Sequence, residues 1–371
     1  MRIGIDARLL RVPRGIGNYV QALLTGLSRI DCDHEFILYV DSSAATAHAP
    51  KDDRFITRLL EPEFYPFWEQ IVLPLAIRRD KLDVMHCPGN TAPLISIGRT
   101  RLLVTIHDVI YLAAHFNGHT TFAHRLQNAY YRALVPRIAK RASRILTDSY
   151  FSRSDIASHL NVAEDDISVV HLAAGEHFRP IANERSAFVR TICSSNPYVV
   201  APAAEDPRKN TATLIRAFGR AGDLIGEDYL LILVGLSPSA IVRFDRLAES
   251  YGLAHRVKCL GFVREEELVE LYNAASFAAY PSLYEGFGLP VIEAMACGTP
   301  LIASNSTSIP EIAGGAAVLV DPCSETEIAS AMVRLAGSSP LRAQFREMGI
   351  VRSAEFSIKK LATETLAIYA G

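Results

Sequence analysis

The sequence of 371 residues lacks any apolar run close to the roughly 20 residues that a membrane-spanning helix needs. Its densest apolar stretch, residues 229–236, has the length and composition of a buried strand. The first ten residues, MRIGIDARLL, lack the long apolar core of a signal peptide. Neither charge sign dominates, because 38 basic and 40 acidic residues leave a formal net charge of −2. We therefore expect a cytoplasmic protein that does not bind nucleic acid.

Closely spaced cysteines are absent as well. There are six cysteines and no CxxC pair, which argues against a zinc site and against a small disulfide scaffold. They are Cys32, Cys87, Cys193, Cys259, Cys297 and Cys323. No internal repeat is visible, so a solenoid or propeller is disfavoured.

What the sequence does contain is an alternation of apolar, β-branched runs with amphipathic stretches, in a chain that is 49% hydrophobic and 21% charged. This alternation predicts an α/β protein, with parallel sheets covered by helices. The pattern starts again in the second half, so we expect two doubly wound domains with a linker within residues 171–185. The expected strands are 3–5, 36–40, 84–86, 102–106, 144–147, 167–170, 198–201, 229–234, 257–260, 277–280, 301–303 and 318–320. Expected helices include 17–30 and 122–140.

Open α/β sheets bind ligands beyond the carboxyl ends of their strands, so the residues that follow each strand are the candidates for a site. After the first strand, Gly15 and Gly17 precede a helix, where backbone amides and the helix dipole favour an anion. A tight connection is the alternative interpretation. The segment is not a GxGxxG fingerprint, because Gln21 follows Tyr19 and Val20, and an NAD-dependent dehydrogenase is therefore disfavoured.

Two further strand ends carry charged or titratable side chains. His107 follows residues 102–106, where it could donate to a hydroxyl or transfer a proton, or simply bond neighbouring backbone. Arg208 and Lys209 lie between strand 198–201 and a helix that begins near Thr211. Two cations beside helix N-terminal amides suit a phosphate, although a solvated helix start is the alternative.

Residues 281–300 are the most informative segment. A strand ends at Tyr280, a loop then carries Glu285, and a helix begins near Pro290 and ends before Gly298. Glu293 falls in the early turns of that helix. Two carboxylates eight positions apart could bind a sugar and a ribose, with backbone amides between them, or could be a surface loop residue and a favourable charge near a helix N-terminus. Those amides belong to Gly286, Phe287, Gly288 and Leu289.

Five cations gather on and just after the expected helix 122–140. They are Arg132, Arg137, Lys140, Arg141 and Arg144. Such a segment is typical of a solvated helix face whose arginine stems cover apolar surface. The alternative is peripheral contact with an anionic membrane or with an anionic lipid-linked substrate.

The segment EGFGLPVIE resembles the E-x7-E signature of retaining glycosyltransferases, specifically of glycosyltransferase family 4. Other segments resemble the family in the same order along essentially the whole chain. They are RIGIDAR, RGIGNY, FWEQIVLP, VTIHD, TDSYFSRSDI, DPRKN, LGFV and SIPEIAG. The resemblance implies the GT-B fold, in which two Rossmann-like doubly wound parallel-sheet domains face each other across a cleft. It implies an acceptor-side domain at 1–175, a nucleotide-sugar domain at 176–355, and a helix at 356–371 that packs back on the first domain.

The resemblance also implies roles for individual residues. Glu293 would bind the nucleotide ribose, Glu285 the donor sugar hydroxyls, and Lys209 would neutralise the leaving diphosphate. The backbone of Gly286, Phe287, Gly288 and Leu289 would hold the sugar and the diphosphate. His107 would contact the donor sugar, and Val263 the base.

Two glycines and one departure from the family complete this set. Gly15 and Gly17 would line the cleft against the diphosphate and the acceptor. Many relatives carry a second basic residue where this chain has Ala203 and Ala204, and Arg208 is the candidate substitute.

The reaction implied is transfer of a hexose from a nucleotide sugar to an acceptor hydroxyl, with retention at the anomeric carbon. We expect no metal cofactor, because no DxD-like motif stands at an appropriate strand end and Lys209 with helix amides could stabilise the diphosphate.

GIGNY, FWEQ and PRKN look most like bacterial mannosyltransferases of O-antigen or exopolysaccharide synthesis. The preferred donor is therefore GDP-mannose, and the preferred acceptor a glycan or polyprenyl-linked glycan. A UDP-hexose or UDP-N-acetylhexosamine donor is the alternative, followed by a nucleotide-sugar 2-epimerase and a noncatalytic sugar-nucleotide binder.

Overall fold

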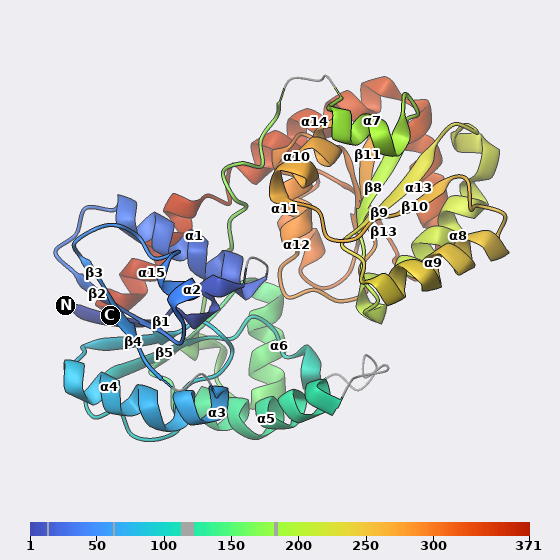
Figure 1. Cartoon of the computed structure of the whole chain (residues 1–371). Helices are drawn as coiled ribbons and strands as arrows, with labels where there is room; N and C mark the ends of the chain where they lie inside the picture. The colour runs from blue at the N-terminus through green and yellow to red at the C-terminus, as the bar shows by residue number, and fades with distance from the viewer. Residues whose placement is uncertain (13–14, 62–63, 113–121, 182–184) are drawn as a thin grey trace. The chain divides into compact units, whose positions relative to one another are not determined.

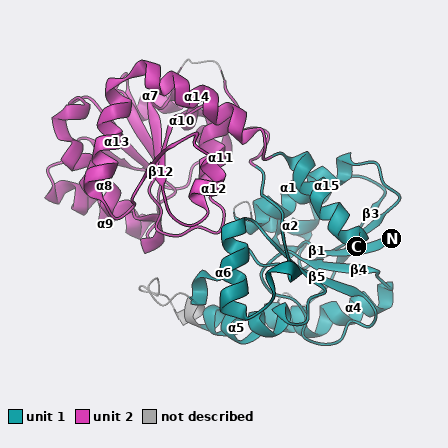
Figure 2. Ribbon diagram, turned by 180° about the vertical axis from the view of Figure 1, so that it is seen from behind, with its two compact units in different colours: residues 1–173, 357–371 teal, residues 174–356 magenta. Residues whose placement is uncertain are grey.

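The structure is a computed structural model that describes residues 1–371 apart from 13–14, 62–63, 113–121 and 182–184. The chain divides into two compact units (Figures 1 and 2). Unit 1 comprises Met1–Ala173 and Ser357–Gly371, and unit 2 comprises Ala174–Phe356. The chain therefore passes between the units twice.

Unit 1 is built on a seven-stranded parallel sheet in the order β3-β2-β1-β4-β5-β6-β7. Its strands are β1 (Arg2–Asp6), β2 (Glu35–Val40), β3 (Phe55–Leu59), β4 (Val84–Cys87), β5 (Arg101–Thr105), β6 (Arg144–Thr147) and β7 (Ile167–Val169). Its helices are α1 (Ile16–Arg29), α2 (Ser43–Thr46), α3 (Tyr65–Phe67), α4 (Leu73–Asp80), α5 (Phe122–Ala139), α6 (Tyr150–Leu160) and α15 (Ile358–Ala370), with a π-helical turn at Trp68–Val72. The central strands β1, β2 and β4 are almost fully buried because helices cover both faces of the sheet.

Unit 2 is built on a six-stranded parallel sheet in the order β10-β9-β8-β11-β12-β13. Its strands are β8 (Tyr198–Pro202), β9 (Leu230–Val234), β10 (Val257–Cys259), β11 (Phe277–Tyr280), β12 (Leu301–Ser304) and β13 (Val318–Val320). Its helices are α7 (Ala187–Cys193), α8 (Thr211–Ala221), α9 (Pro238–Ser250), α10 (Glu265–Ala274), α11 (Leu289–Ala296), α12 (Ile309–Ala313), α13 (Glu325–Gly337) and α14 (Ser339–Ser353). Two doubly wound parallel sheets confirm the predicted GT-B fold class.

Every strand and both helices that the sequence predicts are present, with ends within one residue of those expected. The strand that the sequence analysis missed is β3. It lies at the edge of its sheet and is short, and it carries the polar residues Thr57 and Arg58. An edge strand is paired on one side only, so it needs less apolar sequence and gives a weaker signal.

Each sheet reverses its order of strands at one place. In unit 1 the chain runs outward from β1 to β3 and then returns to the other side of β1 at β4. In unit 2 it runs outward from β8 to β10 and returns at β11. The loops diverge at such a reversal and leave a crevice beyond the carboxyl ends of the two strands. The β1/β4 and β8/β11 junctions are therefore where ligands are expected.

The last helix, α15, is part of unit 1 and packs against α1 (Figure 1). Contact is close at Gly26 on α1, where an added Cβ would lie 2.5 Å from Ala362 Cβ and 2.7 Å from the Ile358 carbonyl oxygen. The end of α15 is also fixed, because Arg101 donates to the carbonyl oxygens of Ile368 and Tyr369 at 3.1 Å each. Within the described ranges, no helix is both long and apolar enough to cross a membrane.

We expect Gly26→Ala to destabilise the protein by about 1–3 kcal/mol, because the added methyl group forces α1 and α15 apart. Alanine is otherwise the better helix former, by about 1 kcal/mol. Gly337→Ala is the matched control, since nothing lies within 4 Å of the added Cβ at the end of α13. Urea unfolding measures both, and equal stability changes for the two variants would contradict the close α1–α15 contact.

Candidate active site

The β8/β11 junction of unit 2 holds a buried ion pair. Lys209 follows β8 and Glu285 follows β11, and Lys209 Nζ lies 2.8 Å from Glu285 Oε1. The same oxygen accepts hydrogen bonds from Tyr280 Oη at 2.7 Å and from Ser282 Oγ at 2.6 Å. Glu285 is buried, so three donors replace the water that its charge would otherwise need.

Asn210 fixes the loop that carries Lys209. It has a left-handed backbone with φ of 57°, which ends the short turn Pro207–Lys209 and lets α8 begin at Thr211. Its side-chain amide donates to the carbonyl oxygens of Pro281, at 3.0 Å, and Pro322, at 2.6 Å. One buried amide thus joins the loops that follow β8, β11 and β13, and the position of Lys209 depends on it.

The loop from Glu285 to Leu289 is fixed by contacts with Ser308 and Ile309, at the start of α12. Ser308 Oγ lies 2.9 Å from the carbonyl oxygens of Glu285 and Phe287. Gly288 adopts a φ of 104°, and a Cβ there would lie 2.6 Å from Ile309 Cδ1. Both features require glycine at this position. Gly286 and Leu289 lie on either side of the Phe287–Gly288 pair, so the predicted backbone segment forms one fixed loop into α11.

The pKa values of the two glutamates, Glu285 and Glu293, are shifted in opposite directions. Burial raises the pKa of Glu285, but the charge of Lys209 and the three hydrogen bonds outweigh it, and the pKa is lowered overall. Burial together with the charge of Glu265 raises the pKa of Glu293 to about 7, against a weaker opposing effect of Lys209. The carboxylate of Glu293 accepts no hydrogen bond from any residue that the structure describes. It is therefore the acceptor that stays available to a ligand.

Two other predicted residues of unit 2 lie at the same edge of the sheet. The guanidinium of Arg208 pairs with Asp206, with Nη2 at 2.8 Å from Oδ2. Val263 stands between β10 and α10, two residues before the Glu265 that acts on Glu293. Ala203 and Ala204 follow β8, as the sequence requires, and the role of Arg208 as their substitute stays a prediction.

The remaining predicted residues belong to unit 1. Gly15 has a φ of 53° and precedes α1, and Gly17 lies in the first turn, where a Cβ would fall 1.7 Å from the Val12 carbonyl oxygen. Pro13 and Arg14 of the same loop lie outside the described residues. His107 follows β5, and its Nδ1 lies 2.8 Å from Asp148 Oδ2. The predicted residues thus form two groups, one on each unit.

Sequence reasoning missed a second buried cluster at the β1/β4 junction of unit 1. Glu69 is fully buried and accepts hydrogen bonds from Tyr65 and Tyr130 at 2.6 Å and from Thr91 at 2.5 Å. Arg8 lies 2.9 Å from Asp6 and holds its guanidinium 3.7 Å from the centre of the Tyr65 ring. The FWEQ segment contains Glu69, but two of its partners, Thr91 and Tyr130, come from distant parts of the chain.

The basic segment of α5 is partly engaged with the protein itself. Arg132 donates to the Tyr111 carbonyl oxygen at 2.9 Å, Arg137 to that of Ala133, and Arg144 to that of Asp165. Lys140 and Arg141 are exposed. Three of the five cations therefore bind backbone carbonyls of the protein, which agrees with the interpretation of this segment as an ordinary solvated helix face.

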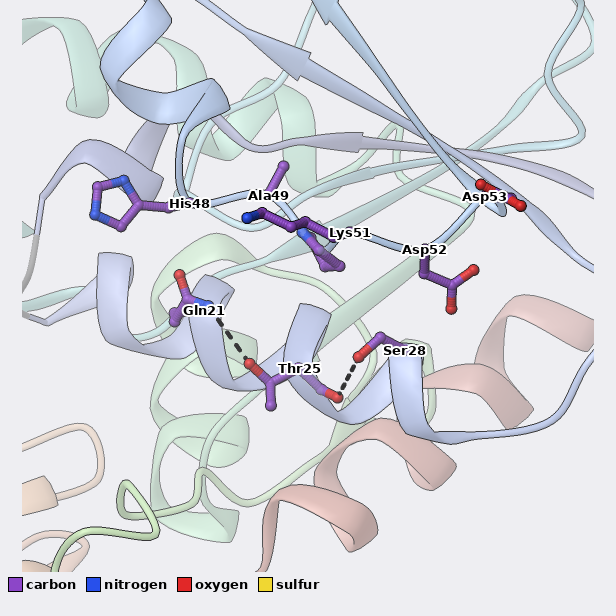
Figure 3. A pocket seen from close by; sticks show the side chains of 9 residues that line it. Gln21, Thr25, Ser28, His48, Ala49, Lys51, Asp52 and Asp53 are labelled. Atoms are coloured by element: carbon purple, nitrogen blue, oxygen red, sulfur yellow. Dashed lines mark hydrogen bonds between the residues drawn. The ribbon is translucent and has the colours of Figure 1, made fainter.

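A polar hollow of about 610 Å³ lies between α1 and the segment that precedes β3, and Figure 3 shows the side chains that line it. Gln21, Thr25 and Ser28 line it from the helix, and His48 to Asp53 line it from the segment before β3. None of the predicted site residues lines this hollow. No group of three or more His, Cys, Asp or Glu side chains within the described ranges is arranged to hold a metal ion.

Known proteins match both parts of the chain. Residues 13–173 match the family described as Glycosyltransferase Family 4, and residues 183–352 match Glycosyl transferases group 1. The MMP alpha-(1->4)-mannosyltransferase of Mycolicibacterium hassiacum is 30% identical over 326 residues, which cover 83% of this chain and 75% of that protein. The chain belongs to glycosyltransferase family 4.

Two more comparisons define the extent of this similarity. The serotype-specific mannosyltransferase WbdA of Escherichia coli is 30% identical over 223 residues, or 59% of this chain, but the match spans only 27% of WbdA. The fold of this chain is similar to that of Anabaena Alr3699/HepE, solved in complex with UDP and glucose, with a TM-score of 0.76 and 18% identity. That match covers 100% of this chain and 99% of HepE.

The opposite electrostatics of the two glutamates predict opposite effects of Glu→Gln at pH 7. Unfolded glutamate titrates at about 4.3 and Glu293 at about 7, so the stability that Glu293 contributes falls as pH rises between these values. Glu293→Gln should therefore raise the free energy of unfolding at pH 7, by about 1–3 kcal/mol at most. Glu285→Gln should lower it by a similar amount, since it removes a charge that Lys209 needs.

Urea unfolding at pH 5 and pH 7 measures both variants, and each serves as the control for the other. The gain from Glu293→Gln should shrink at pH 5, because the wild-type carboxyl is then protonated. A shift of both variants in the same direction at pH 7 would contradict the assignment.

Proposed function

We propose that this family 4 protein transfers a hexose from a nucleotide sugar to a hydroxyl of a glycan or lipid-linked glycan, with retention at the anomeric carbon. The observation that carries this proposal is the β8/β11 junction. There Lys209 is paired with an ionised Glu285, while Glu293 remains without a partner among the described residues. The cation Lys209 suits a diphosphate. The fixed carboxylate of Glu285 suits the hydroxyls of a sugar, and the available carboxylate of Glu293 suits those of a ribose.

Each residue has a defined task in this reaction. Glu293 accepts hydrogen bonds from the ribose hydroxyls, and Glu285 accepts them from the donor sugar. Lys209 stabilises the charge that develops on the diphosphate as the bond between the anomeric carbon and the phosphate oxygen breaks. The amide groups that precede α11 add the positive end of a helix dipole. This arrangement stabilises the leaving group without a metal cofactor.

Retention follows from delivery of the acceptor to the face that the diphosphate leaves. The acceptor oxygen forms a bond to the anomeric carbon while the departing phosphate oxygen takes the acceptor proton. The family resemblance favours this same-face displacement over a double displacement through an enzyme carboxylate.

GDP-mannose is the preferred donor because relatives over most of the chain are named as mannosyltransferases. A UDP-hexose is the alternative, and the UDP and glucose bound to HepE favour it. The names of the E. coli relatives support a role in bacterial polysaccharide synthesis.

We expect nucleotide diphosphate release from GDP-mannose in EDTA, and faster release when a glycan acceptor is present. Lys209→Met should lower turnover about 10²–10³-fold, because the leaving diphosphate loses its cation. Lys359→Met, an exposed lysine of α15, is the control and should leave turnover unchanged. The measurement is a release assay over GDP-mannose, UDP-glucose, UDP-galactose and UDP-N-acetylglucosamine.

Each outcome of that assay has a defined meaning. Selective turnover of a UDP-sugar would replace the donor but keep the transferase. Conversion of the sugar without acceptor-dependent release would indicate the epimerase. Binding without turnover would indicate a noncatalytic binder.

A lipid-linked acceptor further suggests that unit 1 contacts an anionic membrane. Supporting this, four large apolar side chains recur at helical spacing before and along α3 and α4 and are 39–68% exposed. They are Phe64, Phe67, Ile71 and Leu75. Helix α3 lies next to α5 in Figure 1, and Tyr130 of α5 donates a hydrogen bond to Glu69, which follows α3. The exposed Lys140 and Arg141 lie at the end of α5.

We expect the protein to co-sediment with phosphatidylglycerol-containing vesicles and to bind pure phosphatidylcholine vesicles at least tenfold more weakly. Leu75→Glu should weaken sedimentation because it removes an apolar contact with the membrane. The double variant Lys140→Glu, Arg141→Glu should weaken it too, because each cation near an anionic surface contributes about 1 kcal/mol of attraction. Val242→Glu, an exposed apolar position on α9 of unit 2, is the control. Equal binding of all variants would rule out this surface.

A further inference from the structure

His107 is held at four points by groups of unit 1. Its backbone N–H donates to Asn90 Oδ1 at 2.8 Å, and its carbonyl oxygen accepts from Ser152 Oγ at 3.1 Å. The ring lies between Asp148 Oδ2, 2.8 Å from Nδ1, and the Pro88 carbonyl oxygen, 3.0 Å from Nε2. The side chain is buried, so its orientation and its protonation are set by these neighbours.

The ring partners fix the number of protons. A backbone carbonyl only accepts hydrogen bonds, so Nε2 must carry a proton to satisfy the contact with Pro88. The contact between Nδ1 and Asp148 requires one more proton. Since an ordinary carboxyl titrates at about 3.9 and an ordinary imidazole at about 6.5, that proton belongs to the ring.

A second buried histidine, His86 on β4, shows the contrast. Its Nε2 lies 2.7 Å from Thr105 Oγ1 and its Nδ1 lies 2.7 Å from Tyr369 Oη. Hydroxyl groups can donate or accept, so a neutral ring satisfies both contacts. Burial lowers the pKa of His86 to about 3, which keeps it neutral. The difference between the two histidines is the carboxylate.

Asp148 itself needs a positive neighbour. It is buried, and its second oxygen, Oδ1, has no hydrogen-bond partner among the described residues. A buried carboxylate with an unsatisfied oxygen is unfavourable unless a cation lies against it. Among the described residues its salt-bridge partner is His107. The two groups therefore stabilise each other's charges.

We propose that Asp148 is a positioning residue that keeps His107 as an imidazolium, so that His107 contributes a fixed positive charge and cannot act as the general base. This rests on the proposed function. With Nε2 already protonated, His107 has no site for the acceptor proton, which leaves it to the diphosphate. The charge lies beside α1, because Tyr19 of that helix contacts the His107 ring edge-on at 5.0 Å.

The surrounding groups agree with this assignment. Burial lowers the pKa of His107, but the charge and hydrogen bond of Asp148, the Pro88 carbonyl and the charge of Asp108 outweigh it and raise the pKa overall. Among the described residues, the other titratable groups that face the ring are His86, which is neutral, and Tyr19, whose pKa is raised by burial.

Protonation can be measured directly on the whole protein, without any activity. Histidine labelled with ¹⁵N, with His107→Gln used to assign the signals among 11 histidines, reports both ring nitrogens by NMR. We expect both nitrogens of His107 to be protonated at pH 7.5 in the wild type, and Asp148→Asn to make the ring neutral at that pH. A neutral ring in the wild type would overturn the proposal, and so would an imidazolium that survives in Asp148→Asn.

The pH profile then tests what the charge does. The ratio of kcat/KM for Asp148→Asn to that of the wild type should fall about tenfold or more at pH 7.5, and should recover as the pH falls and the ring regains its proton. The titration of Glu293 changes the rates of both proteins in the same way, so it cancels in this ratio. Asp155→Asn, which changes a carboxylate of α6 that pairs with the exposed His159, is the matched control and should keep a ratio near one.

The two kinds of failure are distinguishable. A ratio for Asp148→Asn that is low but independent of pH would overturn the charge role, because a merely structural defect gives that result. Absence of turnover by every variant, with the NMR result as expected, would count against the proposed function alone. If Asp148→Asn does not fold, titration of wild-type His107 from pH 6 to pH 9 decides, and loss of the proton below pH 7 would contradict the proposal.

Discussion

The ion pair between Lys209 and Glu285 joins the two strands at which the second sheet reverses its order. A charged pair in a buried place is stable only where further groups satisfy it, and here Tyr280 and Ser282 complete the coordination of one carboxylate oxygen. The loops that bring these residues together are in turn joined by the amide of Asn210. Ser308 fixes the loop from Glu285 to Leu289 that leads into α11, through the carbonyl oxygens of Glu285 and Phe287. A ligand that approaches this junction meets groups that are already placed, so little reorganisation is needed on binding.

Each unit holds one titratable group that is charged and one that is not stabilised in its charged form. In unit 2 a lysine keeps Glu285 ionised, while Glu293, which has no such partner among the described residues, has a pKa raised to about 7. In unit 1 a carboxylate keeps a histidine charged, while His86 nearby stays neutral between two hydroxyl groups. In each case the partner, and not burial alone, decides which group carries charge. Sequence distance gives no hint of these partners, since Asp148 lies 41 positions from His107.

The sequence was sufficient for the fold because buried parallel strands are continuous apolar runs, and their positions follow from composition alone. The sequence also placed Lys209 and Glu285 just after strands, and Glu293 in the helix that follows Glu285, at the edge of a sheet where open α/β folds bind ligands. It failed at β3, whose edge position relaxes the apolar pattern, and at Asp148 and Glu69, whose importance comes from contacts with distant residues. Local pattern predicts where an element lies. Which side chains it meets depends on register and packing, which one sequence does not encode in any short motif.

The return of α15 to unit 1 has a consequence for synthesis on the ribosome. Unit 2 is continuous in sequence, whereas unit 1 is interrupted and receives its last helix only after Phe356. The surface of α1 around Gly26 and the ring of His86 stay without their final partners until the end of the chain emerges. Unit 2 can therefore complete its packing during translation. Unit 1, although most of it is synthesised first, completes its packing only after α15 has been synthesised. A ribosome that stops early would leave a folded second unit attached to an incomplete first one, with an apolar helix surface open to chaperones.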